Sequence, residues 1–157
     1  MKKSSISFYK YMSPSIIWTG IIFYLLLTRA PMEMLHQFKY YTMAFVRSVL
    51  GFSLSSIHNP SIGMLDKVAH FGTFAVFAFL FAWGLYKQPA YHSFQRHALW
   101  LSFAVTIALG GLTEYLQYLL TTFRAGDWID FAADVLGGAA GLLFFLLWKR
   151  KTPSLAY

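Results

Sequence analysis

The sequence predicts an all-α integral membrane protein with four transmembrane helices and a further amphipathic or interfacial helix in the first outer loop. Two observations predict this class. Hydrophobic residues make up 57% of the 157 residues and charged residues only 12%, whereas soluble domains carry about 25% charged residues. The apolar residues also gather into four runs, each close to the length of about 20 residues that a helix needs to cross a bilayer.

The four apolar runs are separated by polar and proline-containing segments. All five prolines fall at or near the edges of runs, where a missing backbone N–H breaks no interior hydrogen bond. The first run has a basic start, but Pro31 makes a poor cleavage site after it, so we interpret this run as an uncleaved anchor helix. The runs cover residues 12–28, 68–86, 98–120 and 129–148.

The segment between the first two runs is long for a loop. Its apolar residues recur at roughly helical spacing, with Lys39 and Arg47 between them, which predicts a helix on the membrane surface or one packed over the outer end of the bundle. We therefore divide the chain into an N-terminus with the first anchor helix (1–28), an extracytoplasmic loop (29–65), a three-helix core (66–148) and a basic tail (149–157).

The Lys and Arg residues predict the orientation of the chain in the membrane. With four spans, the two termini and the 87–97 loop share one side and hold eight of these residues, against five on the other side. Loops rich in Lys and Arg stay in the cytoplasm. Both termini are therefore expected there.

Five of the six acidic residues fall near one depth on the outer side of the predicted bundle. Asp66 begins the second span, Glu114 lies about 9 Å inside the outer end of the third, and three aspartates run into the fourth. Ionisable groups inside a membrane normally face one another or a wet cavity. The sequence therefore predicts a polar pocket open to the outer face, lined by the second, third and fourth spans.

Residues of this layer are assigned roles by their chemistry. Acid–base or catalytic roles are expected for His70, Glu114, Asp127 and Asp130. Ligand-binding roles are expected for Asp66, Lys67, Gln117, Arg124 and Asp134.

Structural alternatives stay open for several of these residues. Asp66 and Asp127 could be helix N-caps, which accept hydrogen bonds from unpaired backbone N–H groups. Glu114 could form an ion pair with Arg124, and Lys67 could extend its amine to the membrane interface.

Small residues recur every four positions in the fourth run, at Ala133, Gly137 and Gly141. This spacing lets helices approach through their backbones. We expect this run to pack centrally with its acids turned inward, and a homo-oligomer through Gly137 and Gly141 is an alternative use of the same face.

Three motifs in order resemble the VanZ-like family of small bacterial membrane proteins. They are Asp66-Lys67-Val68-Ala69-His70-Phe71, then Glu114-x-x-Gln117, then Arg124-x-x-Asp127-x-x-Asp130-x-x-x-Asp134-x-x-Gly137. The resemblance covers about residues 60–148, but the family commonly has Asn at the position of Asp134 and often Tyr at that of Phe74. It implies a role in the bacterial cell envelope, in the inner membrane, and a link to glycopeptide (teicoplanin) susceptibility.

Four hypotheses follow for the predicted pocket. The first is binding of a lipid phosphate headgroup or a lipid-linked cell-wall intermediate, with Arg124, Lys67 and protonated His70 holding the phosphate. The second is a metal-assisted phosphoryl or headgroup transferase, because the carboxylates supply enough oxygens for Mg²⁺ or Mn²⁺. The third is a carrier that uses Glu114, and the fourth is a structural scaffold.

Other chemistries are excluded by composition. The chain has no cysteine, which rules out a disulfide framework, a thiolate metal site and a Cys nucleophile. No basic run is interleaved with stacking aromatic residues, so the net charge of +7 does not indicate nucleic-acid binding.

Overall fold

The protein is a bundle of four long helices. The computed structural model describes residues 2–28, 33–34, 37, 40–41, 62–88, 91–121 and 127–151. The helices are α1 (Lys2–Leu27), α3 (Ile62–Tyr86), α4 (His92–Leu120) and α5 (Trp128–Lys151). All four are long and apolar enough to cross a membrane, which confirms the predicted fold class. The helix predicted in the first outer loop lies almost wholly outside the described residues.

The helices extend beyond the apolar runs that predicted them. Because α1 begins at Lys2, Pro14 lies well inside it rather than near its start. A residue with an N–H at this position would bond the carbonyl of Lys10, four residues earlier. The hydroxyl of Ser13 donates to that carbonyl instead, at 3.1 Å. A neighbouring side chain thus replaces the hydrogen bond that proline removes.

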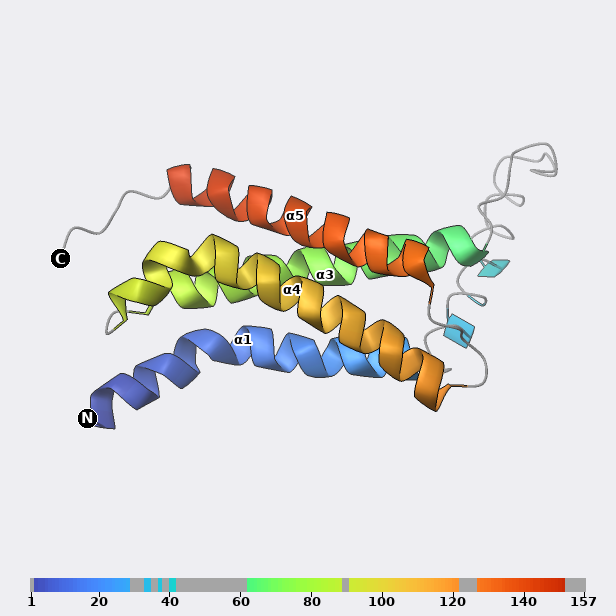
Figure 1. Ribbon diagram of the computed structural model, residues 1–157, viewed down its shortest axis with the longest axis horizontal. Helices are drawn as coiled ribbons and strands as arrows, with labels where there is room; N and C mark the ends of the chain where they lie inside the picture. The colour runs from blue at the N-terminus through green and yellow to red at the C-terminus, as the bar shows by residue number, and fades with distance from the viewer. Residues whose placement is uncertain are drawn as a thin grey trace.

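The four helices lie side by side along the long axis of the molecule, with α1 and α5 on its two sides (Figure 1). The start of α1 and the end of α5 lie at the same end of the bundle, as four antiparallel spans require. Helices α3 and α4 each contact the three other helices, whereas α5 packs mainly against α3. The expectation that the fourth span would be central is therefore wrong, although its acids do face inward.

Close backbone packing joins α3 and α5. A Cβ atom on Gly137 would overlap the backbone carbonyl oxygen of Phe71, and one on Gly141 would overlap that of Ala75. The small-residue spacing is thus used within one chain, against α3. An oligomer through the same glycines stays a prediction.

Apolar side chains fill the middle of the bundle. Phe74 and Ile22 are fully buried and join α3 to α1, while Phe145 is 1% exposed and packs α5 against α3. The indole N–H of Trp18 donates to the carbonyl of Thr73 at 2.8 Å, which ties α1 to α3 one turn below His70. This apolar core holds the outer thirds of α3, α4 and α5 in register, and the polar residues lie there.

Candidate functional site

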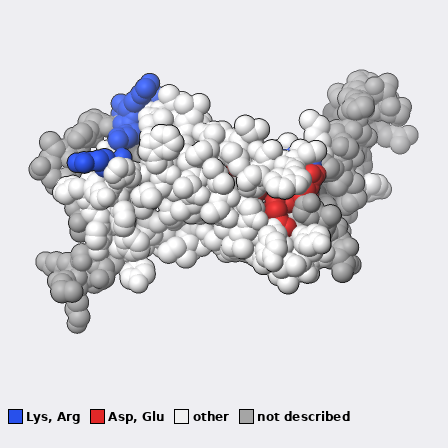
Figure 2. All heavy atoms as spheres, in the orientation of Figure 1, with Lys and Arg blue, Asp and Glu red and all other residues white. Residues whose placement is uncertain are grey.

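The acidic residues gather at one end of the bundle. In Figure 2 the visible Asp and Glu side chains lie near the end opposite to most of the visible Lys and Arg side chains. That opposite end carries Lys149, Arg150 and Lys151, in the last turn of α5. The acids belong to the second turn of α3, to the start and first two turns of α5 and to the last two turns of α4. The structure therefore brings three helices together at a single polar layer, as the sequence predicts.

His70 is the centre of this layer. Its side chain is fully buried, and its Nδ1 lies 2.9 Å from Oδ1 of Asp134, which is also fully buried. The same nitrogen lies 3.8 Å from Oε1 of Glu114, whose side chain is 12% exposed. The histidine on α3 thus contacts a carboxylate from α5 and lies close to another from α4.

Lys67 joins the two aspartates at the start of α5. Its amine donates to Oδ1 of Asp130 at 2.7 Å and to Oδ2 of Asp127 at 3.2 Å. It therefore does not simply extend to the membrane interface, but holds the first turn of α5 against α3. The side chains of Lys67 and Asp127 are about one-third and two-fifths exposed, so solvent weakens this pair more than it weakens the contacts of His70.

Asp127 is the N-cap of α5, which confirms the structural alternative for this residue. Its Oδ1 accepts the N–H of Ile129 at 2.9 Å, and its own N–H donates to Oε2 of Glu114 at 2.7 Å. The hydrogen bond from the N–H of Ile129 lowers the pKa of the Asp127 carboxyl most, and the bond from the Lys67 amine lowers it further. Glu114 thereby fixes the start of α5 from the neighbouring helix.

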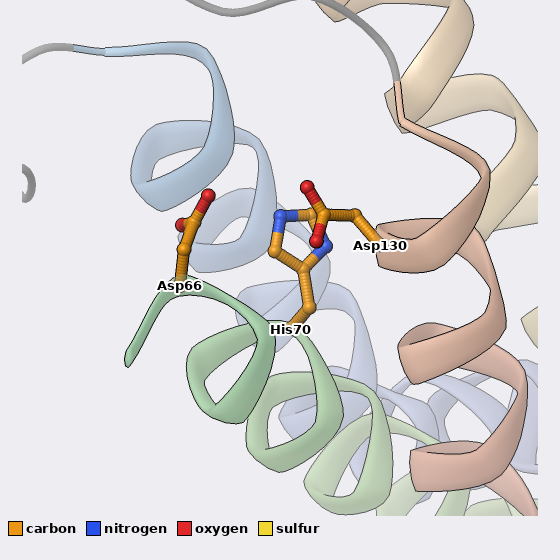
Figure 3. A group of neighbouring side chains, drawn as sticks. All are labelled: Asp66, His70 and Asp130. Carbon is orange, nitrogen blue, oxygen red and sulfur yellow. The ribbon is translucent and has the colours of Figure 1, made fainter. Parts of the chain in front are cut away.

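Asp66 lies one turn before His70, on the same face of α3, and is 9% exposed. Helix α3 begins at Ile62, four residues earlier, so Asp66 lies in the second turn. The N-cap alternative is therefore wrong for this residue. Figure 3 shows its carboxylate beside the His70 ring, with the carboxylate of Asp130 overlapping the ring in this view.

Two overlapping groups of side chains could hold a metal ion. One consists of Asp66, His70 and Asp130, and the other of His70, Glu114 and Asp134, and within each group the ligand atoms lie within 4.8 Å of one another. His70 belongs to both groups. A nitrogen with two carboxylates is a common donor set for divalent transition metals.

Three buried polar atoms of the layer have no hydrogen-bond partner among the described residues. They are Nε2 of His70, Oε1 of Glu114 and Oδ2 of Asp134. Gly110 of α4 makes room for the last, since a Cβ there would lie 3.2 Å from it. Buried polar atoms are nearly always paired, so three in one cluster require an explanation.

One of the predicted site residues does not join the cluster, and another lies outside the described residues. Gln117 is buried, but its amide donates to the carbonyl of Leu26 at 3.0 Å and ties α4 to the end of α1. Arg124 lies in the 122–126 segment, outside the described residues. The predicted ion pair between Arg124 and Glu114 therefore stays a prediction. So does the outward pocket, because this segment connects α4 to α5 at the polar end.

A buried amide side chain at the opposite end of the bundle gave no signal in the sequence. Gln88 is fully buried, and its amide donates to the carbonyl of Gly84 at 3.2 Å. Its position beside Pro89, in a predicted loop, gave no sign of burial. It lies two residues after the end of α3, and its Oε1 has no hydrogen-bond partner among the described residues.

An apolar groove lies between α4 and α5, nearer the end that carries the termini. It has a volume of ≈ 350 Å³ and is lined by Leu99, Trp100, Phe103, Ala139, Leu142, Leu143 and Leu146. From Phe103 to Glu114 is eleven residues, or about 16 Å along the helix axis. The groove and the polar layer thus lie along the same pair of helices at different depths.

Comparisons with known proteins find similarity over most of the chain. A family model described as VanZ/LLP1 matches residues 12–149. An uncharacterized protein of Schizosaccharomyces pombe is 32% identical over 87 residues, which cover 55% of this chain and 49% of that protein. The chain thus spans about half the length of this curated relative. No solved structure matches.

Proposed function

This chain belongs to the VanZ/LLP1 family, and we propose that it is a multi-pass envelope protein that binds the phosphate group of a lipid at its polar end. The ligand is either a membrane phospholipid or a lipid-linked cell-wall intermediate, since both present a phosphate beside an apolar chain. One observation carries the proposal. Three buried polar atoms, of His70, Glu114 and Asp134, have no partner among the described residues, although they lie in helices long enough to cross a membrane.

A purely structural role explains this observation less well. A polar cluster that only fixes helix packing works best when every buried donor and acceptor is satisfied, because each unpaired group costs free energy. Here Nε2 of His70 and Oδ2 of Asp134 lack partners while their neighbouring atoms are bonded. The unpaired carboxylate oxygens call for a hydrogen-bond donor or a cation in the ligand, whereas Nε2 of a protonated His70 can donate to its phosphate.

The charge of the layer limits how a phosphate can bind. The described part holds five carboxylates against one lysine and His70. A phosphate therefore needs more positive charge, which Arg124 and a protonated His70 can supply. Arg124 precedes Asp127 by three residues in the sequence, and a guanidinium matches phosphate geometry with two parallel hydrogen bonds.

The apolar groove between α4 and α5 supports a lipid rather than a water-soluble ligand. Its lining is almost wholly apolar, and it lies about 16 Å below Glu114 along α4. A lipid whose headgroup sits at the polar layer would carry its chain along these two helices into the groove. The same pair of helices thus offers a site for each part of the ligand.

The orientation predicted from the sequence completes the proposal. The three basic residues that end α5 lie on the side opposite to the acidic layer. We therefore place the termini in the cytoplasm and the polar layer at the outer face of a bacterial inner membrane, where a link to teicoplanin susceptibility would arise. The chain has no cysteine, so single cysteines at positions 3 and 64 can report each side by labelling from outside the cell.

Native mass spectrometry tests lipid binding. The full chain is released from mild detergent as wild type, Arg124→Ala and Glu114→Gln, with Arg96→Ala as a matched control at the exposed start of α4. We expect a phosphate-bearing lipid on wild type and the control, and at least a tenfold loss on the other two. The mass separates a phospholipid from a lipid-linked intermediate. The same lipids on all four proteins would overturn the proposal.

A further inference from the structure

We propose that Asp66, His70 and Asp130 form a binding site for a divalent transition-metal ion of the Zn²⁺ class. The inference stands on the contacts among these side chains and on Asp134. It does not rest on the proposed lipid ligand, because the metal can be measured without it.

The orientation of His70 is the first step. Its Nδ1 lies 2.9 Å from Oδ1 of Asp134, and both side chains are fully buried. An ionised carboxylate only accepts hydrogen bonds, so the ring proton lies on Nδ1. In the neutral ring the other nitrogen, Nε2, then carries a free lone pair, and a metal ion there takes the place of the second proton that the ring holds when it is protonated. A histidine held in this way by a carboxylate is the usual arrangement behind a metal-bound imidazole.

The surroundings of Nε2 are the second step. This atom is buried and has no hydrogen-bond partner among the described residues. Figure 3 shows the carboxylate of Asp66 beside the ring and that of Asp130 overlapping the ring in this view. One ligand atom from each of the three residues lies within 4.8 Å of the others. A buried imidazole with an unpaired nitrogen, close to two carboxylates, is a site for a cation.

The alternative group of His70, Glu114 and Asp134 is less suited to an ion. Its shortest contact, from Nδ1 to Asp134, is already a hydrogen bond, which a metal would have to break. Oε2 of Glu114 accepts the N–H of Asp127. These two acids therefore orient and surround the site, while Asp66 and Asp130 bind the ion.

The donor set favours a transition metal over Mg²⁺. Imidazole nitrogen binds Zn²⁺ well, whereas Mg²⁺ prefers oxygen ligands and retains its water. Three protein ligands also leave a position open, as in sites where zinc binds a water or a further ligand. The sequence alone had suggested Mg²⁺ or Mn²⁺, because it does not show that His70 lies between the acids.

Small movements would close the site around the ion. Ligand atoms at about 2.0–2.2 Å from Zn²⁺ in tetrahedral geometry lie about 3.3–3.6 Å apart, so a pair at the 4.8 Å limit must approach by about 1.2–1.5 Å. Oδ1 of Asp130 accepts a hydrogen bond from Lys67, but a carboxylate has a second oxygen. The lysine can therefore keep its bond while Asp130 binds the metal.

Zinc binding by the untagged full chain tests the proposal. The chain is purified in detergent with a chelator, and the chelator is then removed. It is titrated with Zn²⁺ in the presence of an indicator that competes for the ion. Stoichiometry is measured by elemental analysis. His70→Gln and Asp130→Asn remove ligands, Asp134→Asn alters only the orienting carboxylate, and His97→Gln is the matched control, since His97 is exposed at the other end of the bundle.

We expect one tightly bound Zn²⁺ per chain in wild type and in His97→Gln, unaffected by equimolar Mg²⁺. Removal of either ligand should weaken binding at least 100-fold, and Asp134→Asn about 10- to 100-fold, as is usual for an orienting carboxylate. Asp66→Asn replaces His70→Gln as the decisive variant if the latter does not fold. Equal zinc affinity in wild type and the ligand variants would overturn the inference.

The failure of this inference and of the lipid proposal are separable. Lipid retained by a chain that binds no zinc overturns only the metal site. One zinc per chain with no specific lipid overturns only the lipid proposal.

Discussion

Replacing Gly137 by alanine tests whether the close approach of α3 and α5 builds the polar layer. A Cβ at this position would overlap the carbonyl oxygen of Phe71 and would lie 2.8 Å from its carbonyl carbon and 2.9 Å from its Cα. Carbon atoms pack at about 3.5–4.0 Å. The added Cβ is fixed to the backbone of α5 and would meet backbone atoms of α3, so no side-chain rotation can relieve the overlap. The two helices must separate.

The required separation is large compared with the tolerance of the site. An increase of about 0.6–1.2 Å restores carbon–carbon contact. His70 adjoins Phe71, and Asp134 lies one turn before Gly137, so the 2.9 Å contact between them spans the same interface. The separation takes this contact to or beyond about 3.5 Å, where a hydrogen bond is lost.

The free energy of unfolding should fall by about 2–5 kcal/mol. Overpacking costs about 1–3 kcal/mol, and loss of a hydrogen bond to a charged group adds about 1.5–3 kcal/mol. Alanine returns about 1 kcal/mol through its higher helix propensity. The steric and polar costs therefore outweigh the gain.

Reversible unfolding in mixed micelles, followed by far-ultraviolet circular dichroism, measures this change. Gly72→Ala is the matched control, because a Cβ on Gly72 meets nothing within 4 Å. It should be neutral or slightly stabilising. If Gly137→Ala unfolds with the same free energy as Gly72→Ala, the helices are not in backbone contact and the reasoning fails.

Two further predictions concern the start of α5 and the proline of α1. Asp127→Asn keeps the N-cap but removes the negative charge. The pKa of Asp127 is lower in the folded protein than in the unfolded chain. The stability that its charge contributes is therefore present above the unfolded pKa of about 3.9 and is lost as pH falls through the folded pKa. The variant's melting midpoint should therefore fall less than that of wild type between pH 5 and pH 3; equal falls would contradict this. Ser13→Ala leaves the Lys10 carbonyl without the donor that replaces the Pro14 N–H, and should cost about 0.5–1.5 kcal/mol. The double variant Ser13→Ala, Pro14→Ala restores a backbone donor and should regain that loss.

The sequence was sufficient for the helices and for the existence of the polar layer. Runs of apolar residues fix which segments cross a membrane, because length and composition determine the cost of insertion. The topology then places Asp66, Glu114 and Asp130 on one side of the membrane. Because an ionisable side chain that faces lipid is costly, these residues face the interior of the bundle. These steps need no knowledge of how the helices pack.

The sequence could not decide which partner each residue contacts. Gln117 shares a helical face with Glu114, yet its amide reaches the end of α1, because α1 passes beside this part of α4. Asp66 looked like a cap only because the apolar run seemed to begin after it, whereas α3 begins at Ile62. Such errors arise from helix ends and rotation, which depend on packing partners rather than on local periodicity.

The way in which the bonds of the layer are distributed separates a site from a structural cluster. Atoms that join helices are bonded: the Lys67 amine holds two aspartates, and the N–H of Asp127 bonds Glu114. Three of the five buried side-chain atoms without partners among the described residues, Nε2 of His70 foremost, belong to the same layer. If the cluster served only to hold α3, α4 and α5 together, an apolar residue at position 70 would pack the helices with no unpaired nitrogen. The retained imidazole, fixed on one side by Asp134 and unpaired on the other, is therefore best explained by a bound ligand.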